Sequence, residues 1–466
     1  MFAKIQRVHF VGIGGIGMSG IAEVLLNLAY KVSGSDLKPS SVTKRLAGLG
    51  ATIFEGHHAG NIAGAEVVVI SSAVRPDNPE LLAAREAHIP VIPRAEMLAE
   101  LMRLKYGIAV AGMHGKTTTT SMIAAVLAAG GLDPTVVVGG RVDAMGSNAR
   151  LGKSQYLVAE ADESDRSFLK LSPILSVVTN IDREHMDCYR DMEDIERTFV
   201  EFMDRVPFYG MVVACNDDDR LRALLPQLRR RAVTYGTRED SDFVISSVEF
   251  RNPRSATRFR VNYGGRSLGE FQLRVPGAHN VLNATAAIAT GIGLDVAVDH
   301  IRTGLEEFRG VDRRLQMIGQ AGGVSVIDDY GHHPTEIRAT LAAARQCGYK
   351  RIHVIFQPHR YTRTQALMDD FAGAFRDADS LILLDIYPAS ESPIPGVTTQ
   401  ALANRIAKLE DRVVICAASF ADAIEAAVKM SAPGDMILTL GAGSITQLGG
   451  QVVEALQHSK AAVSDE

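Results

Sequence analysis

The sequence predicts an α/β fold arranged as three consecutive domains. Three segments each begin with a short apolar, strand-like run that ends in a glycine-rich or polar turn, and strand-like and helix-like runs alternate afterwards. Such alternation is typical of parallel sheets covered by helices. With 466 residues, of which 46% are hydrophobic, the chain is long enough for several separate cores. We place the domains at residues 1–105, 106–312 and 313–466.

The first domain opens with the strand-like run Val8–Val11, which is followed by GIGGIGMSG and a helical stretch at Ile21–Leu28. Further strand-like runs at Tyr30–Ser33 and Glu66–Ile70 alternate with helical stretches. A short strand, a glycine-rich turn and a helix in this order predict a Rossmann-like parallel sheet wound on both sides.

The second domain begins at Gly107–Ala111, which leads directly into GMHGKTTTT and a helix at Ser121–Ala129. This order is typical of the core of P-loop ATPases. Later, apolar and polar residues alternate over Phe259–Tyr263, just before Gly264-Gly265. That pattern predicts an added antiparallel hairpin with one exposed face.

The third domain begins near Arg313 and again alternates strands with helical spans, which predicts a second Rossmann-like sheet. Its strand-like runs are Val324–Ile327, Ile352–Phe356, Ser380–Leu384 and Met436–Leu440.

Composition and charge argue against several classes of protein. No stretch reaches about eighteen apolar residues, so we expect no membrane partner. The net charge of −5 disfavours a nucleic-acid partner, which would require a basic face. The cysteines are far apart and indicate neither a disulfide framework nor a zinc site. We therefore expect a cytoplasmic protein, as a monomer or weak homodimer.

The first glycine-rich turn matches the pattern G-x-G-x-x-G at Gly12, Gly14 and Gly17. Its amides and the following helix N-terminus suit a pyrophosphate. Asp36 lies at the end of the next strand, where a dinucleotide enzyme holds a ribose hydroxyl. A nicotinamide dehydrogenase and a UDP-sugar-binding protein both fit this pattern, and a tight turn that merely needs glycine is a further alternative.

The turn after Gly107–Ala111 predicts a nucleotide site, because it follows a strand and opens a helix. Lys116 would contact the β- and γ-phosphates of ATP, and the Thr117 hydroxyl would ligate Mg²⁺. The alternative is a glycine–lysine turn without a nucleotide. The residues that would surround the phosphates are Gly112, Met113, His114, Gly115, Lys116, Thr117 and Thr118.

Charged clusters follow strand-like runs in the second and third domains. AEADESD follows Tyr156–Val158 and offers the oxygen ligands that Mg²⁺ prefers. DDYGHHP follows Val324–Ile327, and QPHRYTRT follows Ile352–Phe356 with dense positive charge. Adjacent acids and histidines directly after a strand are hard to explain by packing, although solvated turns remain the alternative for most of them.

These stretches together resemble the Mur ligase family, through all three domains. The shortened phosphate loop, in which Val110 stands where a full P-loop has its first glycine, is typical of that family and its folylpolyglutamate synthase relatives. Met113 departs from the threonine more usual there, but backbone amides bind the phosphates. The matching stretches are VGIGGIGMSGIAEVL, SSAV, RAEMLAELM, GMHGKTTTT, VAEADESDRSFL, TNIDREHMD, PGAHNVLNA, DDYGHHPTE, FQPHRYTRT, YPASESPIPG and GAGSI.

The resemblance implies an ATP-dependent amide-forming ligase of peptidoglycan synthesis, and it favours the alanine-adding member. That activity converts the lactyl carboxylate of UDP-N-acetylmuramate to an acyl phosphate and couples it to L-alanine, with ATP and Mg²⁺ as cofactors. Later-acting members carry a lysine soon after the histidine that matches His185. Here no lysine lies between Lys170 and Lys350, which fits the alanine-adding enzyme.

The resemblance also implies roles for single residues. Glu160 and His185 would hold Mg²⁺ together with Thr117, although a histidine in such a turn is often only at the surface. Catalytic roles would fall to Lys116, His332, Arg360 and Arg363, with the two arginines orienting the amino acid. ATP would also contact Asn283, Arg314 and Asp329, and the UDP-sugar would contact Gly12, Gly14, Gly15, Gly17, Asp36, Ser71 and Ser72.

Three other functions remain as alternatives. A ligase of the same family could attach a preformed peptide to the same nucleotide sugar. A nicotinamide-dependent dehydrogenase would use the first glycine-rich turn but leaves GMHGKTTTT and QPHRYTRT unexplained. A non-catalytic nucleotide-binding switch would not need the histidines and arginines of the third domain.

Overall fold

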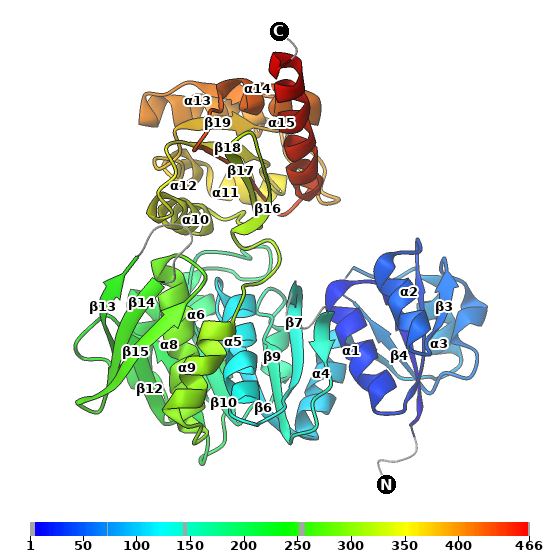
Figure 1. Cartoon of the computed structure of the whole chain (residues 1–466). Coiled ribbons are helices and arrows are strands. Elements are labelled where there is room, and N and C mark those ends of the chain that lie inside the picture. The colour runs from blue at the N-terminus through cyan, green and yellow to red at the C-terminus, as the bar shows by residue number, and fades with distance from the viewer. Residues whose placement is uncertain (1–4, 72, 143–146, 251–256, 465–466) are drawn as a thin grey trace. The chain divides into compact units, whose positions relative to one another are not determined.

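The computed structural model describes residues 5–464 with the exception of residues 72, 143–146 and 251–256. Within these residues the chain forms three sheets (Figure 1). It divides into two compact units. The first unit comprises residues 1–248, 259–272 and 280–309, and the second comprises residues 249–258, 273–279 and 310–466.

The first sheet is parallel and has the strand order β3-β2-β1-β4-β5. The order reverses at β1, so the turn after β1 lies where doubly wound sheets bind ligands. Helix α1 begins at Ile16, earlier than the predicted Ile21, because packing overrides the low helix propensity of Gly17 and Gly20. The strands are β1 (Arg7–Val11), β2 (Lys31–Asp36), β3 (Thr52–Glu55), β4 (Val67–Ile70) and β5 (Val91–Pro93), and the helices are α1 (Ile16–Asn27), α2 (Ser41–Gly48), α3 (Pro79–Glu86) and α4 (Arg94–Arg103).

The second sheet has ten strands in the order β15-β14-β13-β12-β11-β10-β6-β9-β7-β8. Its strands from β13 to β7 are parallel, and β8 is antiparallel to β7. The strands are β6 (Tyr106–Ala111), β7 (Thr135–Val142), β8 (Ser147–Arg150), β9 (Tyr156–Glu160), β10 (Leu175–Val178), β11 (Met211–Cys215), β12 (Ala232–Gly236), β13 (Phe243–Glu249), β14 (Thr257–Tyr263) and β15 (Arg266–Leu273). The accompanying helices are α5 (Lys116–Ala129), α6 (Met192–Met203), α7 (Asp219–Leu224), α8 (Ala278–Gly293) and α9 (Val298–Glu307).

The predicted hairpin forms one edge of this sheet. Gly264 and Gly265 have φ values of 56° and 76° and are the only residues between β14 and β15, so these neighbouring strands are antiparallel. Helix α5 is buried along most of its length and packs against α9. The two helices approach closely, since a Cβ added at Gly304 would lie 2.8 Å from the carbonyl oxygen of Ala125.

The third sheet has the order β16-β17-β21-β18-β19-β20, with β16 antiparallel to β17 and the other pairs parallel. Its strands are β16 (Gln316–Ala321), β17 (Val324–Asp329), β18 (Ile352–Phe356), β19 (Ser380–Leu383), β20 (Val414–Cys416) and β21 (Met436–Leu440). Its helices are α10 (Pro334–Gln346), α11 (Tyr361–Ala366), α12 (Met368–Ala372), α13 (Thr399–Glu410), α14 (Phe420–Met430) and α15 (Leu448–Ser464).

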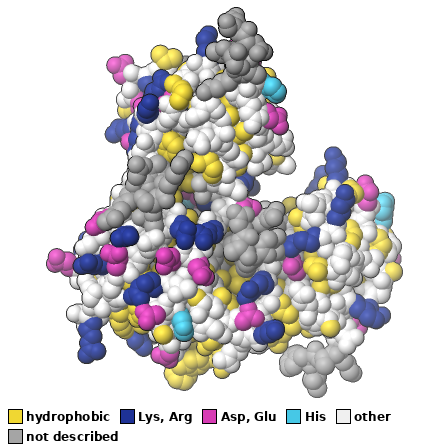
Figure 2. All heavy atoms as spheres, viewed as in Figure 1, with side chains coloured by type: hydrophobic (Ala, Val, Ile, Leu, Met, Phe, Trp, Pro, Cys, Tyr) yellow, Lys and Arg dark blue, Asp and Glu magenta, His cyan; other side chains and the backbone are white. Residues whose placement is uncertain are grey.

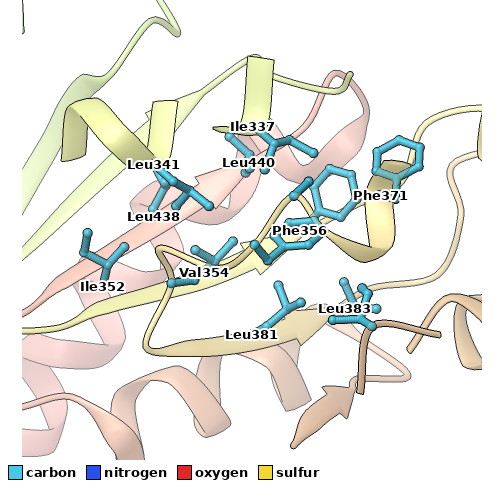
Figure 3. Close-up of a cluster of buried hydrophobic side chains, with 14 of the residues drawn as sticks. Ile337, Leu341, Ile352, Val354, Phe356, Phe371, Leu381, Leu383, Leu438 and Leu440 are labelled. Carbon is cyan, nitrogen blue, oxygen red and sulfur yellow. The ribbon is translucent and has the colours of Figure 1, made fainter. Parts of the chain in front are cut away.

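Both faces of the third sheet are buried. Ile352, Val354 and Phe356 point to the face that α10, α12 and α13 cover (Figure 3). Ile355 points to the opposite face, where α14 and α15 pack. Burial on both sides explains why the central strands β18 and β21 are apolar at nearly every position, whereas the edge strand β16 is partly exposed and more polar.

The surface carries both signs of charge. Figure 2 shows Lys and Arg side chains interspersed with Asp and Glu on the visible face. Among the described residues, every helix is too short or too polar to cross a bilayer.

Candidate active site

The phosphate loop connects β6 to α5 and depends on two glycines in left-handed backbone conformations. Gly112 has φ 128° and Gly115 has φ 83°. A Cβ at Gly112 would collide with the Thr179 hydroxyl, and one at Gly115 would lie 2.8 Å from Oδ1 of Asn283. Residues with side chains are therefore excluded at both positions by conformation and by space.

The loop is fixed by side chains at the end of β10. Asn180 accepts a hydrogen bond from the His114 amide at 2.9 Å and donates one to the His114 carbonyl at 2.9 Å. The Thr179 hydroxyl donates to the same carbonyl at 2.6 Å. The His114 ring lies 3.0 Å from a carboxylate oxygen of Asp182. The loop is thus held in shape before any ligand binds, which is the preorganisation that phosphate binding needs.

The ammonium group of Lys116 is folded back onto this loop. It donates to the carbonyls of Gly112 at 2.6 Å and Met113 at 3.1 Å, and it lies 2.8 Å from Oε1 of Glu163. Burial alone would lower the pKa of Lys116, but the carboxylates of Glu163, Asp162 and Glu160 outweigh it and raise the pKa. The lysine is therefore a permanent cation at neutral pH.

Acidic side chains from the end of β9 face the lysine. Glu160 is the last residue of the strand, whereas the sequence placed it directly after the strand. Asp162 accepts hydrogen bonds from Ser164 at 2.6 Å and from Arg94 at 2.8 Å. Burial would raise the pKa of Asp162, yet Ser164, Arg94 and Lys116 together lower it. This carboxylate is ionised at neutral pH.

Glu163 is more deeply buried than its neighbours, with a 1% exposed side chain. Its Oε1 lies 3.5 Å from Nε2 of His185, which has φ 56°. Its Oε2 is buried and has no hydrogen-bond partner among the described residues. Such an oxygen, beside a histidine and further carboxylates, is suited to a hard divalent cation.

Helix α8 brings a further predicted residue to the loop. Oδ1 of Asn283 accepts a hydrogen bond from the Thr119 hydroxyl at 3.1 Å, and its Nδ2 donates to Asn280 at 3.3 Å. Thr118 is buried, while Thr117 is partly exposed at the start of α5. The second-domain residues predicted for the nucleotide therefore lie together around one helix N-terminus.

The glycine-rich turn of the first sheet is tied to β2. The amides of Gly12 and Ile13 donate to the Ser35 carbonyl at 2.9 and 3.0 Å, and the Gly14 amide donates to the Asp36 carboxylate at 2.8 Å. A Cβ at Gly14 would lie 2.7 Å from that carboxylate, which explains the glycine.

The other residues predicted to contact the UDP-sugar lie close to this turn. Gly15 is the N-cap residue of α1, and a Cβ at Gly17 would lie 3.0 Å from the Arg94 side chain. The Ser71 hydroxyl would lie 3.8 Å from a Cβ at Gly12, whereas Ser72 lies outside the described residues.

Asp328 and Asp329 end β17 in the second unit, and the sequence had placed them after the strand. Asp329 is buried and accepts hydrogen bonds from the amides of Leu315 at 2.8 Å and Gly331 at 2.7 Å. Arg314 lies 3.3 Å from Glu336, and Glu336 also lies 3.3 Å from the His332 ring. The structure thus groups Arg314, Asp329 and His332 at the end of one strand.

The basic turn after β18 lies beside this group. The ring of His359 lies 5.9 Å from that of His332 and stacks on Tyr387 at 5.5 Å. Arg363 lies 3.2 Å from the His359 ring, and Arg360 has φ 71° at the start of α11. Burial, together with His332, Arg363 and Arg360, lowers the pKa of His359 to about 4, so its ring is neutral at neutral pH.

Several residues of the two sites were missed from the sequence. Glu163 lay within AEADESD but was treated as one of the solvated acids. Asn180 and Asp182 lay in the matching stretch TNIDREHMD, yet only its histidine was selected. Arg94, Glu336 and Tyr387 lay in the matching stretches RAEMLAELM, DDYGHHPTE and YPASESPIPG, but they were given no role, because only the fold brings them to the sites.

Three models of the Mur ligase family match the chain in order. The Mur ligase family catalytic domain matches residues 7–106, the Mur ligase middle domain matches residues 110–291, and the Mur ligase glutamate ligase domain matches residues 313–443. The chain therefore belongs to the Mur ligase family, and the resemblance inferred from its motifs is confirmed.

Within the family, the chain is similar to proteins that share one name. The UDP-N-acetylmuramate–L-alanine ligase of Koribacter versatilis is 71% identical, over 99% of this chain and 100% of that protein. The enzyme of that name from Acidobacterium capsulatum is 64% identical over 98% of this chain and 99% of that protein. The crystal structure of the UDP-N-acetylmuramate–alanine ligase of Thermotoga maritima has a TM-score of 0.81 and 31% identity, covering 97% and 99% of the two chains. The predicted α/β fold class is confirmed.

Proposed function

We propose that this chain joins L-alanine to the lactyl carboxylate of UDP-N-acetylmuramate at the expense of ATP, in peptidoglycan synthesis. The observation that carries the proposal is the phosphate loop, with Lys116 held against its carbonyls at the N-terminus of buried helix α5. The high identity to ligases named for this substrate pair supports the choice of reaction.

The reaction proceeds in two steps. A lactyl carboxylate oxygen attacks the γ-phosphorus, the bond from that phosphorus to the β–γ bridging oxygen breaks, and an acyl phosphate and ADP result. The alanine nitrogen then attacks the acyl carbon, the bond to the phosphate oxygen breaks, and the nitrogen loses a proton as inorganic phosphate leaves. Lys116 offsets charge on the phosphates in the first step.

The acidic side of the loop fits a divalent cation, since Glu163 presents a buried oxygen without a partner there. Thr117, Glu160 and His185 would hold Mg²⁺. When bound, Mg²⁺ supplies charge neutralisation at the phosphates.

Substrate positioning falls to the ends of the other two sheets. The N-terminus of α1, which follows Gly12, Gly14 and Gly15, suits the diphosphate of the UDP-sugar, with Asp36, Ser71 and Ser72 as further contacts. Arg360 and Arg363 would orient the alanine carboxylate beside His332, since a guanidinium grips a carboxylate with two donors. Asn283, Arg314 and Asp329 would contact ATP.

We also propose domain boundaries at residues 105 and 312, a cytoplasmic location, and a monomer or weak homodimer with neither membrane nor nucleic-acid partners. All four cysteines are free in the structure.

The test is phosphate release from ATP and Mg²⁺ with UDP-N-acetylmuramate, measured with and without single amino acids. We expect strong stimulation by L-alanine, a product heavier by one alanyl residue, and loss of at least about a hundredfold in rate for Lys116→Ala, because one preorganised cation contributes on that order. Stimulation only by a preformed peptide would move the chain to the peptide-attaching ligases. A bound nicotinamide cofactor without stimulation would favour a dehydrogenase.

A further inference from the structure

The Glu163 carboxylate is a buried charge that the proposed reaction does not yet use. Its Oε1 contacts Lys116 at 2.8 Å, while its Oε2 has no partner among the described residues. A buried acceptor without a hydrogen bond is costly, because it has lost water and gained nothing in exchange. The carboxylate therefore has capacity for a further ligand.

Lys116 occupies a position that a bound nucleotide must change. Its ammonium group sits on the carbonyls of Gly112 and Met113 and on Glu163. A lysine of a phosphate loop has to contact the β- and γ-phosphates instead. Once it does so, Glu163 loses its cation and faces negatively charged phosphates.

Hydrogen bonds to its backbone carbonyl hold Glu163 at this position. The Tyr189 hydroxyl donates to the Glu163 carbonyl at 2.6 Å, and the Arg166 amide donates to the same carbonyl at 3.0 Å. The ring of His185 also lies 3.5 Å from the Glu163 carboxylate. The carboxylate is thus retained beside the loop, where its charge opposes a nucleotide that arrives without a metal.

We propose that Glu163 is a positioning residue that holds Lys116 on the empty loop and makes nucleotide binding depend on a divalent cation. A cation that enters with the phosphates takes over the neutralisation of Glu163, and Lys116 is released to the phosphates. The inference rests on the nucleotide site proposed above.

The test is calorimetric titration of ADP into the full chain, once with EDTA and once with Mg²⁺. We expect Mg²⁺ to strengthen ADP binding to the wild type. In Glu163→Gln, ADP should bind in EDTA about tenfold more tightly than to the wild type, because one close like charge is gone and Lys116 is free. The ratio of affinities with and without Mg²⁺ should shrink by a similar factor.

Two further comparisons control for effects that do not involve the contact between Glu163 and Lys116. Glu201→Gln removes a carboxylate of α6 that pairs with Arg205 at 3.0 Å, and it should leave the ratio unchanged. If Glu163→Gln fails to fold, the single variant Lys116→Met is compared with the double variant Lys116→Met/Glu163→Gln instead. Removing both partners of a buried pair destabilises the fold less than leaving one of them unpaired. The double variant should then show a smaller ratio than the single one.

An equal Mg²⁺ ratio in wild type and Glu163→Gln, or in the single and double variants, would overturn the proposal. So would a wild type that binds ADP equally well in EDTA. Failure of the wild type to bind ADP under both conditions would instead overturn the nucleotide site itself.

Discussion

A single buried carboxylate contributes to the pH dependence of this protein's stability. Glu80 of α3 is fully buried and accepts hydrogen bonds from Ser35 at 2.6 Å and Asn61 at 2.5 Å. Burial by itself would raise its pKa, but His9, Ser35 and Asn61 outweigh that effect and lower the pKa to about 2. The carboxylate therefore stabilises the fold only while it is ionised.

For Glu80→Gln, we expect a loss of stability at pH 7 and a flatter acid response. Lowering the pKa from 4.5 in the unfolded chain to about 2 corresponds to about 3 kcal/mol. Because the folded pKa is the lower one, this contribution is present above pH 4.5 and disappears as the pH falls toward 2. Urea unfolding at pH 7, 4.5 and 3 measures the difference between wild type and variant. A difference that stays constant across this range would contradict the assignment.

Single residues also show what the sequence could reveal about the site. Gly112, Gly115 and Lys116 are contiguous, so their motif predicts a shared site without knowledge of the fold. Glu163 could not be separated from the other acids of its run, because only its burial distinguishes it. Arg94 meets Asp162 through the packing of α4, which no local pattern records.

At the scale of secondary structure, the helix ends carry specific stabilising contacts. Ser40 precedes α2, and its hydroxyl accepts a hydrogen bond from the Thr43 amide at 3.2 Å. The Thr43 hydroxyl in turn accepts one from the Ser40 amide at 2.9 Å. This reciprocal pair satisfies two backbone amides at the helix start.

Ser40→Ala should lower the free energy of unfolding by about 1 kcal/mol, because one amide at the start of α2 loses its acceptor. Chemical denaturation measures the change. Ser41→Ala, at the next and exposed position, is the matched control and should be neutral or slightly stabilising. Equal losses in the two variants would show that the cap is not the cause.

Strand positions were predicted well where apolar runs are bounded by turns, as at Ile352–Phe356 and Met436–Leu440, which the structure reproduces as β18 and β21. The ends of β9 and β17 were placed too early, because Glu160 and Asp329 look like turn residues. Strand propensity does not explain acidic residues at these strand ends, whereas their role in the site does.

At the scale of the whole molecule, three sheets were expected and the described part of the chain forms three, but their strand order could not be read from the sequence. Periodicity shows that a strand exists and says nothing of its neighbour. The hairpin predicted near Gly264-Gly265 joins the large parallel sheet through β13, so one sheet reaches ten strands. Such pairing is set by contacts between residues far apart in sequence.

The third sheet has its own core, which makes its stability separable from that of the first unit. Phe356 is fully buried in this core and lies 5.2 Å from Phe375 between ring centres. We expect Phe356→Ala to destabilise the second unit by about 3–5 kcal/mol through the cavity it creates. Differential scanning calorimetry should show an earlier transition, while ADP binding by the phosphate loop is retained.

The matched control is Phe208→Ala, whose side chain is 89% exposed, and it should change stability by no more than about 0.5 kcal/mol. A loss of ADP binding in folded Phe356→Ala would show that ADP binding by the first unit depends on the packing of the second unit.

The close approach of α9 to α5 has a consequence for how the sequence tolerates change. A methyl group at Gly304 would press on the backbone of Ala125, within the helix that starts at Lys116. A library screened for inactive clones should therefore return Gly304→Ala beside Lys116 variants, although the two positions are far apart in the chain. The phosphate site thus depends on Gly304, which lies in none of the sequence motifs that predict that site.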